Sequence, residues 1–215
     1  RSAVGTVLAE SAELQPFADI QVEVRGKDMP SHRIQAAEVN RCKLGDGEYV
    51  GILRHPKLRP DDSIWMADQR PKPAWVTFPH EAHVYDMRRG MYRGFTNRFE
   101  DVFYPGRAEL YALLPYEVVD IRLQAGRDGN AFVIRGAIVP AEDDTQPTDH
   151  VLHLRVGDPQ GMDHAELARN VLAKDGCFEE RLFLGYNASG GLWTVNARDA
   201  ATGMEKSVLL PVNTE

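Results

Sequence analysis

Apolar and polar residues alternate along much of the chain, which is the pattern of half-buried β-strands. Near the start, Ile20, Val22 and Val24 alternate with polar neighbours and are followed by a turn at 26–30. Runs of this kind recur at short intervals, and each is bounded by turn-forming residues. They predict further strands near 33–41, 47–55, 74–78, 83–87, 94–102, 108–115, 131–138, 150–156, 179–183, 191–198 and 207–212.

The run 150–156 shows the alternation most clearly. It places Leu152, Leu154 and Val156 on one face and polar residues on the other, and we expect the apolar face to be core. The following segment 163–174 has apolar residues at helical spacing, so it fits either a helical turn or a crossover loop.

Short strands separated by Gly, Pro and Asp turns predict an all-β protein of the sandwich type. Over 215 residues the pattern favours two tandem β-sandwich, immunoglobulin-like domains at 16–125 and 126–215, with the boundary near Gly126 in the Gly126-Arg-Asp-Gly129 turn. The spacing of apolar residues in segment 1–15 predicts a short helix or a linker, which Pro16 ends.

Two loops share a short sequence echo. Asp86-Met-Arg-Arg-Gly90 and Asp199-Ala-Ala-Thr-Gly203 each have Asp followed four positions later by Gly, and a Met comes next. An Asp side chain caps a turn by accepting backbone N–H groups, and Gly supplies a positive φ. The echo therefore predicts two hairpin loops of the same structural kind.

Composition narrows the range of partners. The formal net charge of −7 disfavours a nucleic-acid partner, because phosphate binding needs an excess of clustered Lys and Arg. No apolar run approaches the ~20 residues of a membrane span. The two cysteines, Cys42 and Cys177, exclude a disulfide-dense scaffold, and two buried free thiols are favoured over a bridge, which stays open.

A search for catalytic or metal-binding motifs nominates no catalytic residue, no metal ligand and no cofactor. His80-Glu-Ala-His83 differs from the zinc-protease motif because its histidines are three apart, and in a strand they point to opposite faces. The sequence contains neither a Gly-x-Ser-x-Gly elbow nor a thiol-protease signature. Acidic loop residues such as Asp61 and Asp143 are typical of solvated turns, and bound Ca²⁺ there stays open.

Tryptophan matters for a different kind of site, since sugar rings stack on its apolar face. Trp75 and Trp193 lie within predicted strands, and we expect them to fill the cores of their domains. Trp65 follows Asp61-Asp62-Ser63 in a loop-like segment and is the candidate glycan-binding residue.

Several motifs carry a family resemblance. They are Ala82-His-Val-Tyr-Asp-Met-Arg-Arg-Gly-Met-Tyr-Arg-Gly94, Gly94-Phe-Thr-Asn-Arg98, Pro105-Gly106 and Ala112-Leu-Leu-Pro-Tyr116. The first part of the chain with these motifs resembles the C-terminal tail of large bacterial β-galactosidase-like glycoside hydrolases. The second half resembles an Ig-like or macroglobulin-like domain of such tails, through Val156-Gly-Asp-Pro-Gln-Gly161 and Gly191-Leu-Trp-Thr-Val195. The catalytic barrel of those enzymes has no counterpart here, so their catalytic carboxylates correspond to no residue of this chain.

The resemblance implies a non-catalytic accessory tail of a carbohydrate-active enzyme, which stabilises its parent, shapes an oligomer or offers a weak glycan surface. It implies a parent catalytic domain or a homo-oligomer as partner, with a glycan as ligand, and a periplasmic or extracellular location. Two other hypotheses stay open: a free-standing extracellular Ig-like interaction or adhesion module, and an enzyme whose site forms between the domains.

Overall fold

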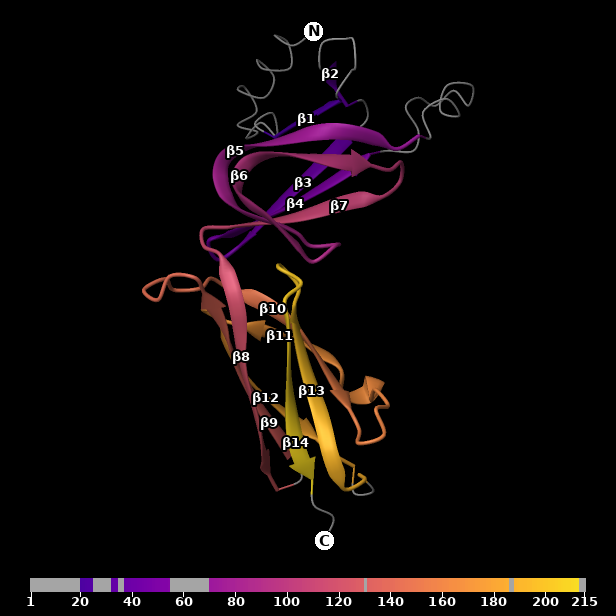
Figure 1. The fold of residues 1–215 in the computed structure, drawn as a ribbon, viewed down its shortest axis with the longest axis vertical. Helices are drawn as coiled ribbons and strands as arrows, with labels where there is room; N and C mark the ends of the chain where they lie inside the picture. Colours follow the sequence, from indigo (N-terminus) through magenta and orange to yellow (C-terminus); the bar gives the residue numbers. More distant parts are fainter. Residues whose placement is uncertain are drawn as a thin grey trace. The chain divides into compact units, whose positions relative to one another are not determined.

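The computed structural model describes residues 20–24, 32–34, 37–54, 70–129, 131–185 and 188–212, and it confirms an all-β fold (Figure 1). Apart from a 3-10 turn, η3 (Ala165–Leu167), the secondary structure of these residues is β. Within them, no helix is long and apolar enough to cross a membrane. The predicted helix or linker at 1–15 lies outside the described residues.

The chain divides into two compact units, which are interleaved in sequence. One contains the described residues of Arg1–Arg41, Val50–Ala82 and Phe95–Leu110, and the other those of Cys42–Tyr49, His83–Gly94 and Tyr111–Glu215. The domain limits 16–125 and 126–215 stay a prediction. The expected turn forms at Gly129, whose φ is 61°, while Gly126 itself lies within a strand.

The first seven strands form one sheet, in the order β2-β1-β5-β7-β4-β3 with β6 paired to β5. Strand β5 is long enough to pair antiparallel with β1 through 74–77 and with β7 through 83–86. The strands are β1 (Gln21–Val24), β2 (His32–Arg33), β3 (Ala37–Leu44), β4 (Gly47–Arg54), β5 (Lys72–Asp86), β6 (Met91–Phe103) and β7 (Ala108–Leu114).

The prediction of two separate strands at 74–78 and 83–87 was wrong, because they form the single strand β5. Pro79 suggested a break, since proline cannot donate a ladder hydrogen bond. In the structure Pro79 lies between the segment paired with β1 and the segment paired with β7, outside the register that the described residues form in either ladder.

The last seven strands form a sandwich of a four-stranded sheet, β11-β10-β13-β14, and a three-stranded sheet, β12-β9-β8. A division of seven antiparallel strands into three and four is the architecture of Ig-like domains. The strands are β8 (Val118–Asp128), β9 (Ala131–Pro140), β10 (His150–Gly157), β11 (Arg169–Ala173), β12 (Cys177–Phe183), β13 (Gly191–Asp199) and β14 (Glu205–Val212).

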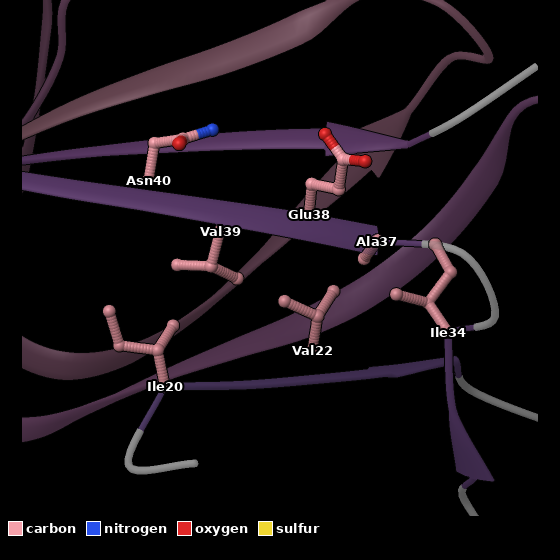
Figure 2. Close-up of a pocket in the computed structure, with 7 residues that line it drawn as sticks. All are labelled: Ile20, Val22, Ile34, Ala37, Glu38, Val39 and Asn40. Atoms are coloured by element: carbon pink, nitrogen blue, oxygen red, sulfur yellow. The ribbon is translucent and has the colours of Figure 1, made fainter. Parts of the chain in front are cut away.

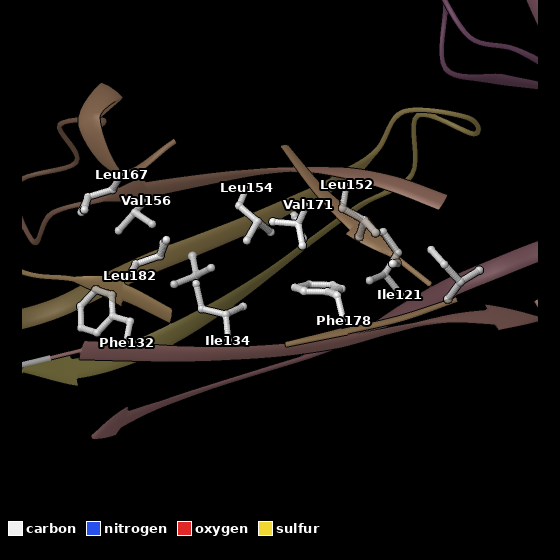
Figure 3. Packing of buried hydrophobic residues seen from close by; sticks show 14 of the residues in the cluster. Ile121, Phe132, Ile134, Leu152, Leu154, Val156, Leu167, Val171, Phe178 and Leu182 are labelled. Atoms are coloured by element: carbon white, nitrogen blue, oxygen red, sulfur yellow. The ribbon is translucent and has the colours of Figure 1, made fainter. Parts of the chain in front are cut away.

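The core of this sandwich lies between its two sheets, and Figure 3 shows the side chains meeting there. Leu152, Leu154 and Val156 of β10 are fully buried while His153 and Arg155 are exposed, which confirms the predicted core face. Each fully buried side chain of this size contributes about 1.5–3 kcal/mol through apolar burial. In the segment 163–174 the expected helical turn forms as η3, and it leads into strand β11, which was not predicted.

Both cysteines are free, but the prediction that they are buried was wrong. Cys42 and Cys177 are exposed because each lies on the outward side of its strand. In β12, buried Phe178 follows exposed Cys177, and Glu179 after it is exposed again.

Candidate functional site

The residues singled out from the sequence do not form one site. Trp65, the glycan-binding candidate, lies outside the described residues and stays a prediction. Trp193 fills the core of the C-terminal sandwich, with 2% exposure, as expected. The same expectation was wrong for Trp75, which is half-buried because it alternates with the core residues Ala74 and Val76 of β5 and lies under the guanidinium of Arg98, 4.8 Å from its ring centroid.

His80 and His83 both lie in β5, three residues apart, so they point to opposite faces of the strand, as predicted. The His83 ring is stacked on Tyr92, and its Nδ1 is 2.7 Å from the Tyr92 hydroxyl. Among the described residues, no group of three or more His, Cys, Asp and Glu side chains is arranged to hold a metal ion.

The two echoed Asp–Gly loops are hairpin turns, as predicted. Asp86 accepts the N–H of Arg89, and Asp199 accepts the N–H and the hydroxyl of Thr202. The glycines that end them have φ values of 60° and 76°. The two turns also meet, because a Cβ on Gly203 would lie 2.3 Å from the Cα of Gly90.

A buried polar chain runs through the sandwich. Tyr116 Oη lies 2.8 Å from His150 Nε2, and His150 Nδ1 lies 2.9 Å from Asp199 Oδ1. The order Tyr–His–Asp resembles a catalytic relay, but His150 and Asp199 are fully buried. Both also have their hydrogen-bonding atoms occupied by neighbours in the chain, so we interpret this group as structural.

One hollow of 380 Å³ lies beside β1 (Figure 2). Its apolar side chains, Val22 of β1 and Val39 of β3 among them, point towards a common space, while Glu38 and Asn40 point away. This lining is typical of the interior of a sandwich and offers no converging polar groups.

A second hollow, of 390 Å³, combines charged and aromatic groups and is the candidate functional site. We call it the His164 pocket. It lies in the C-terminal sandwich, and its lining residues are Asp158, His164, Glu166, Leu167, Phe183, Leu184, Gly185, Ala188, Ser189 and Trp193.

His164 is held between two carboxylates. Its Nδ1 lies 2.7 Å from Glu166 Oε1, and its Nε2 lies 3.4 Å from Asp158 Oδ2. The imidazole is partly accessible, with a side-chain exposure of 27%, and Glu166 is at 70%. Because the carboxylates lie at opposite ring nitrogens, the three side chains fix the ring and do not converge on a metal position.

These contacts set the protonation of the group. Hydrogen bonding to Glu166, followed by that to Asp158, raises the pKa of His164 above 6.5 and favours the imidazolium. The N–H of Met162 is the largest cause of the lowered pKa of Asp158, and hydrogen bonding to His164 lowers the pKa of Glu166.

The loop that supplies this group is built by local hydrogen bonds. Asp158 Oδ1 accepts the N–H groups of Gln160 and Met162, both at 2.9 Å, as Asp side chains do in turns. Gly161 takes the positive φ of 81° that the turn requires. The N–H of His164 then donates to the carbonyl of Val156, which returns the chain to the end of β10.

Two aromatic side chains, Phe183 and Trp193, also line the pocket. The rings of His164 and Trp193 lie 5.2 Å apart, and the Trp193 Nε1–H donates to the carbonyl of Ser189. Phe183, at the end of β12, is 63% exposed. The site thus combines polar side chains held in place by hydrogen bonds with one accessible aromatic ring, that of Phe183.

Sequence reasoning missed this pocket because its members come from separate loops and strands. The sequence pattern gave no role to His164, and Trp193 was assigned to the core. The one local signal was Asp158-Pro-Gln-Gly161, an Asp turn at the end of a strand, followed by a His with a carboxylate two residues later.

Comparisons with known proteins assign no family. No known protein family and no curated protein matches the sequence. Among solved structures, the chain is similar to β-glucuronidase of Ruminococcus gnavus, with 9% identity and a TM-score of 0.27, over 91% of this chain and 43% of that one. It is also similar to the chicken interferon gamma receptor alpha chain, with 8% identity and a TM-score of 0.31, over 82% and 98%.

The chain therefore spans less than half of the β-glucuronidase chain. At these identities and TM-scores the two similarities do not indicate a function. What the fold and the pocket define is an all-β sandwich protein with an accessible polar and aromatic hollow in its C-terminal sandwich.

Proposed function

We propose that the chain is a non-catalytic accessory part of a carbohydrate-active enzyme and that it binds a glycan in the His164 pocket. The observation that carries this proposal is the pairing of an accessible aromatic ring, Phe183, with hydrogen-bonding groups held in fixed orientation, Asp158 and His164. A pyranose presents an apolar face that stacks on an aromatic ring and hydroxyls that donate hydrogen bonds to carboxylate oxygens, and His164 fixes the orientation of two carboxylates here.

The finer assignment, to the tail of a β-galactosidase-like hydrolase, rests on the motifs at 82–98 and 112–116. It is tested by the gene. A reading frame that continues upstream of Arg1 into a catalytic domain supports the tail hypothesis, and a start codon next to Arg1 contradicts it.

Glycan binding is tested by titrating the chain with β-linked tetrasaccharides and following the emission of Trp193, which contacts the pocket's His164 ring. A Trp65→Phe/Trp75→Phe background isolates this signal. We expect a saturable change that Phe183→Ala weakens about tenfold, since stacking on a ring contributes about 1–1.5 kcal/mol.

Phe95→Ala is the matched control, because Phe95 is exposed to a similar degree, 58% against 63%, and does not line the pocket. No response up to millimolar sugar, or an equal loss with both variants, would refute glycan binding here. A hydrolysis assay tests whether the chain is non-catalytic. Hydrolytic activity that persists through purification would overturn that part of the proposal.

A further inference from the structure

The His164 pocket carries negative charge in either protonation state of its histidine. Its charged lining residues are Asp158, Glu166 and His164, and among the described residues that line it there is no Lys or Arg. With a neutral imidazole the formal charge is −2, from two carboxylates. With an imidazolium it is −2 + 1 = −1.

Two basic residues of the adjoining strands β10 and β11 are paired with acids. Arg155 lies 3.6 Å from Asp163, and Arg169 lies 2.8 Å from Glu180. These pairs leave the negative charge of the pocket in place. Glu166 is the group best placed to meet a ligand, because its side chain is 70% exposed while that of Asp158 is 13% exposed.

From these charges we infer that the pocket selects a cationic amino sugar, a pyranose with a protonated amine, over its neutral and anionic analogues. This inference rests on the proposed function and adds the chemical class of the ligand. An ammonium near Glu166 and Asp158 gains Coulomb attraction in a partly solvated setting, whereas a uronate adds a third carboxylate to two that are already there. The apolar face of the ring stacks on Phe183 in all three classes.

The test compares three tetrasaccharides with the same β-1,4 linkage: tetra-glucosamine, cellotetraose and tetra-glucuronate. Binding is measured by Trp193 emission and by amide chemical shifts of Ala188 and Ser189, at a pH below that of amine deprotonation. We expect tetra-glucosamine to bind about tenfold more tightly than cellotetraose, and tetra-glucuronate to bind most weakly.

Glu166→Gln is the discriminating variant, because it removes one charge from an exposed side chain and keeps its shape. We expect it to reduce the preference for tetra-glucosamine to about threefold or less, with cellotetraose nearly unaffected. Glu142→Gln is the matched control, since Glu142 is exposed on another loop and its substitution changes the net charge equally.

The outcomes separate the two proposals. If none of the sugars binds, glycan binding itself fails. If all three bind with equal affinity and Glu166→Gln has no effect, glycan binding stands and the charge preference is overturned. A preference that Glu142→Gln lowers as much as Glu166→Gln reflects the overall charge of the chain, and tetra-glucosamine affinity that Phe183→Ala leaves unchanged shows binding elsewhere; either result overturns the assignment to this pocket.

Discussion

Replacing Tyr116 by Phe tests whether the buried polar chain stabilises the C-terminal sandwich. The hydroxyl of Tyr116 makes two buried hydrogen bonds at 2.8 Å, one with His150 Nε2 and one from the N–H of Thr148. On the other side of the imidazole, Nδ1 faces Asp199. Every atom is satisfied when Nδ1–H donates to Asp199, Tyr116 donates to Nε2 and the Tyr116 oxygen accepts from Thr148.

Tyr116→Phe keeps the ring and leaves two buried groups without a partner, His150 Nε2 and the Thr148 N–H. Each unsatisfied buried group costs about 1–3 kcal/mol, so we expect the free energy of unfolding to fall by about 2–6 kcal/mol. Tyr92→Phe is the matched control. It removes a Tyr–His hydrogen bond of similar length, 2.7 Å to His83, but that bond is exposed and water replaces it at a cost of about 0.5 kcal/mol or less.

Urea unfolding, followed by Trp193 emission in the Trp65→Phe/Trp75→Phe background, reports on the sandwich that holds this network. With a urea dependence of about 2–3 kcal/mol per molar, the midpoint for Tyr116→Phe falls by about 0.7–3 M. If the midpoints of Tyr116→Phe and Tyr92→Phe agree within about 0.2 M, the buried hydrogen bonds do not carry the stability assigned to them.

Three further predictions concern other parts of the structure. Gly203→Ala should lower the free energy of unfolding by about 2 kcal/mol or more, because its Cβ would meet the backbone of Gly90 at 2.3 Å. Gly161→Ala, with open space at its Cβ, should cost only about 1 kcal/mol of backbone strain. Thermal unfolding of the two variants compares these costs. Burial raises the pKa of Tyr49 from 10.0 to about 12, so the contribution of Tyr49 to stability is fully present below pH 10 and is lost by about 1.4 kcal/mol per pH unit up to 12. Burial also raises the pKa values of Tyr85 and Tyr116, so Tyr49→Phe should reduce the alkaline slope by about that amount without abolishing it, as measured by urea unfolding at alkaline pH. NMR titration of His164 should give a pKa above 6.5. The imidazolium, which the carboxylates stabilise, is present at lower pH and is lost as the pH rises through this folded-state pKa. A midpoint at or below pH 6.5 would contradict the carboxylate contacts.

The fold class and the core faces could be predicted because a strand with one buried face has apolar and polar residues at alternating positions in the sequence. In β10 the alternation of Leu152, Leu154 and Val156 with polar residues is enough to assign the core side. Pairing is different, since it depends on distant partners. Pro79 suggested a strand end locally, but the ladders on either side of it are supplied by β1 and β7.

The His164 pocket could not be predicted, because its residues are distant in sequence and come together only when the sheets pack. The position of Trp193 within a predicted strand indicated a core residue, and Trp193 is buried in the core. Its ring also contacts His164, which lies on a loop earlier in the chain. The turn at Asp158 could be recognised from its local sequence, but the contact of Asp158 Oδ2 with His164 Nε2 could not.

The contact between Gly90 and Gly203 also constrains how the chain can evolve. Position 203 cannot gain a side chain unless the backbone of the turn at Gly90 moves, whereas a Cβ on Gly90 would meet Gly203 only at an ordinary contact distance of 3.4 Å, so the turn at 203 depends on the turn at 90 although they lie far apart in sequence. Among homologues, a residue other than Gly at 203 should occur only together with a change in the length or course of the turn at 90. Gly161, with no neighbour at its Cβ position, should drift independently, towards Asn or Asp, which tolerate its positive φ.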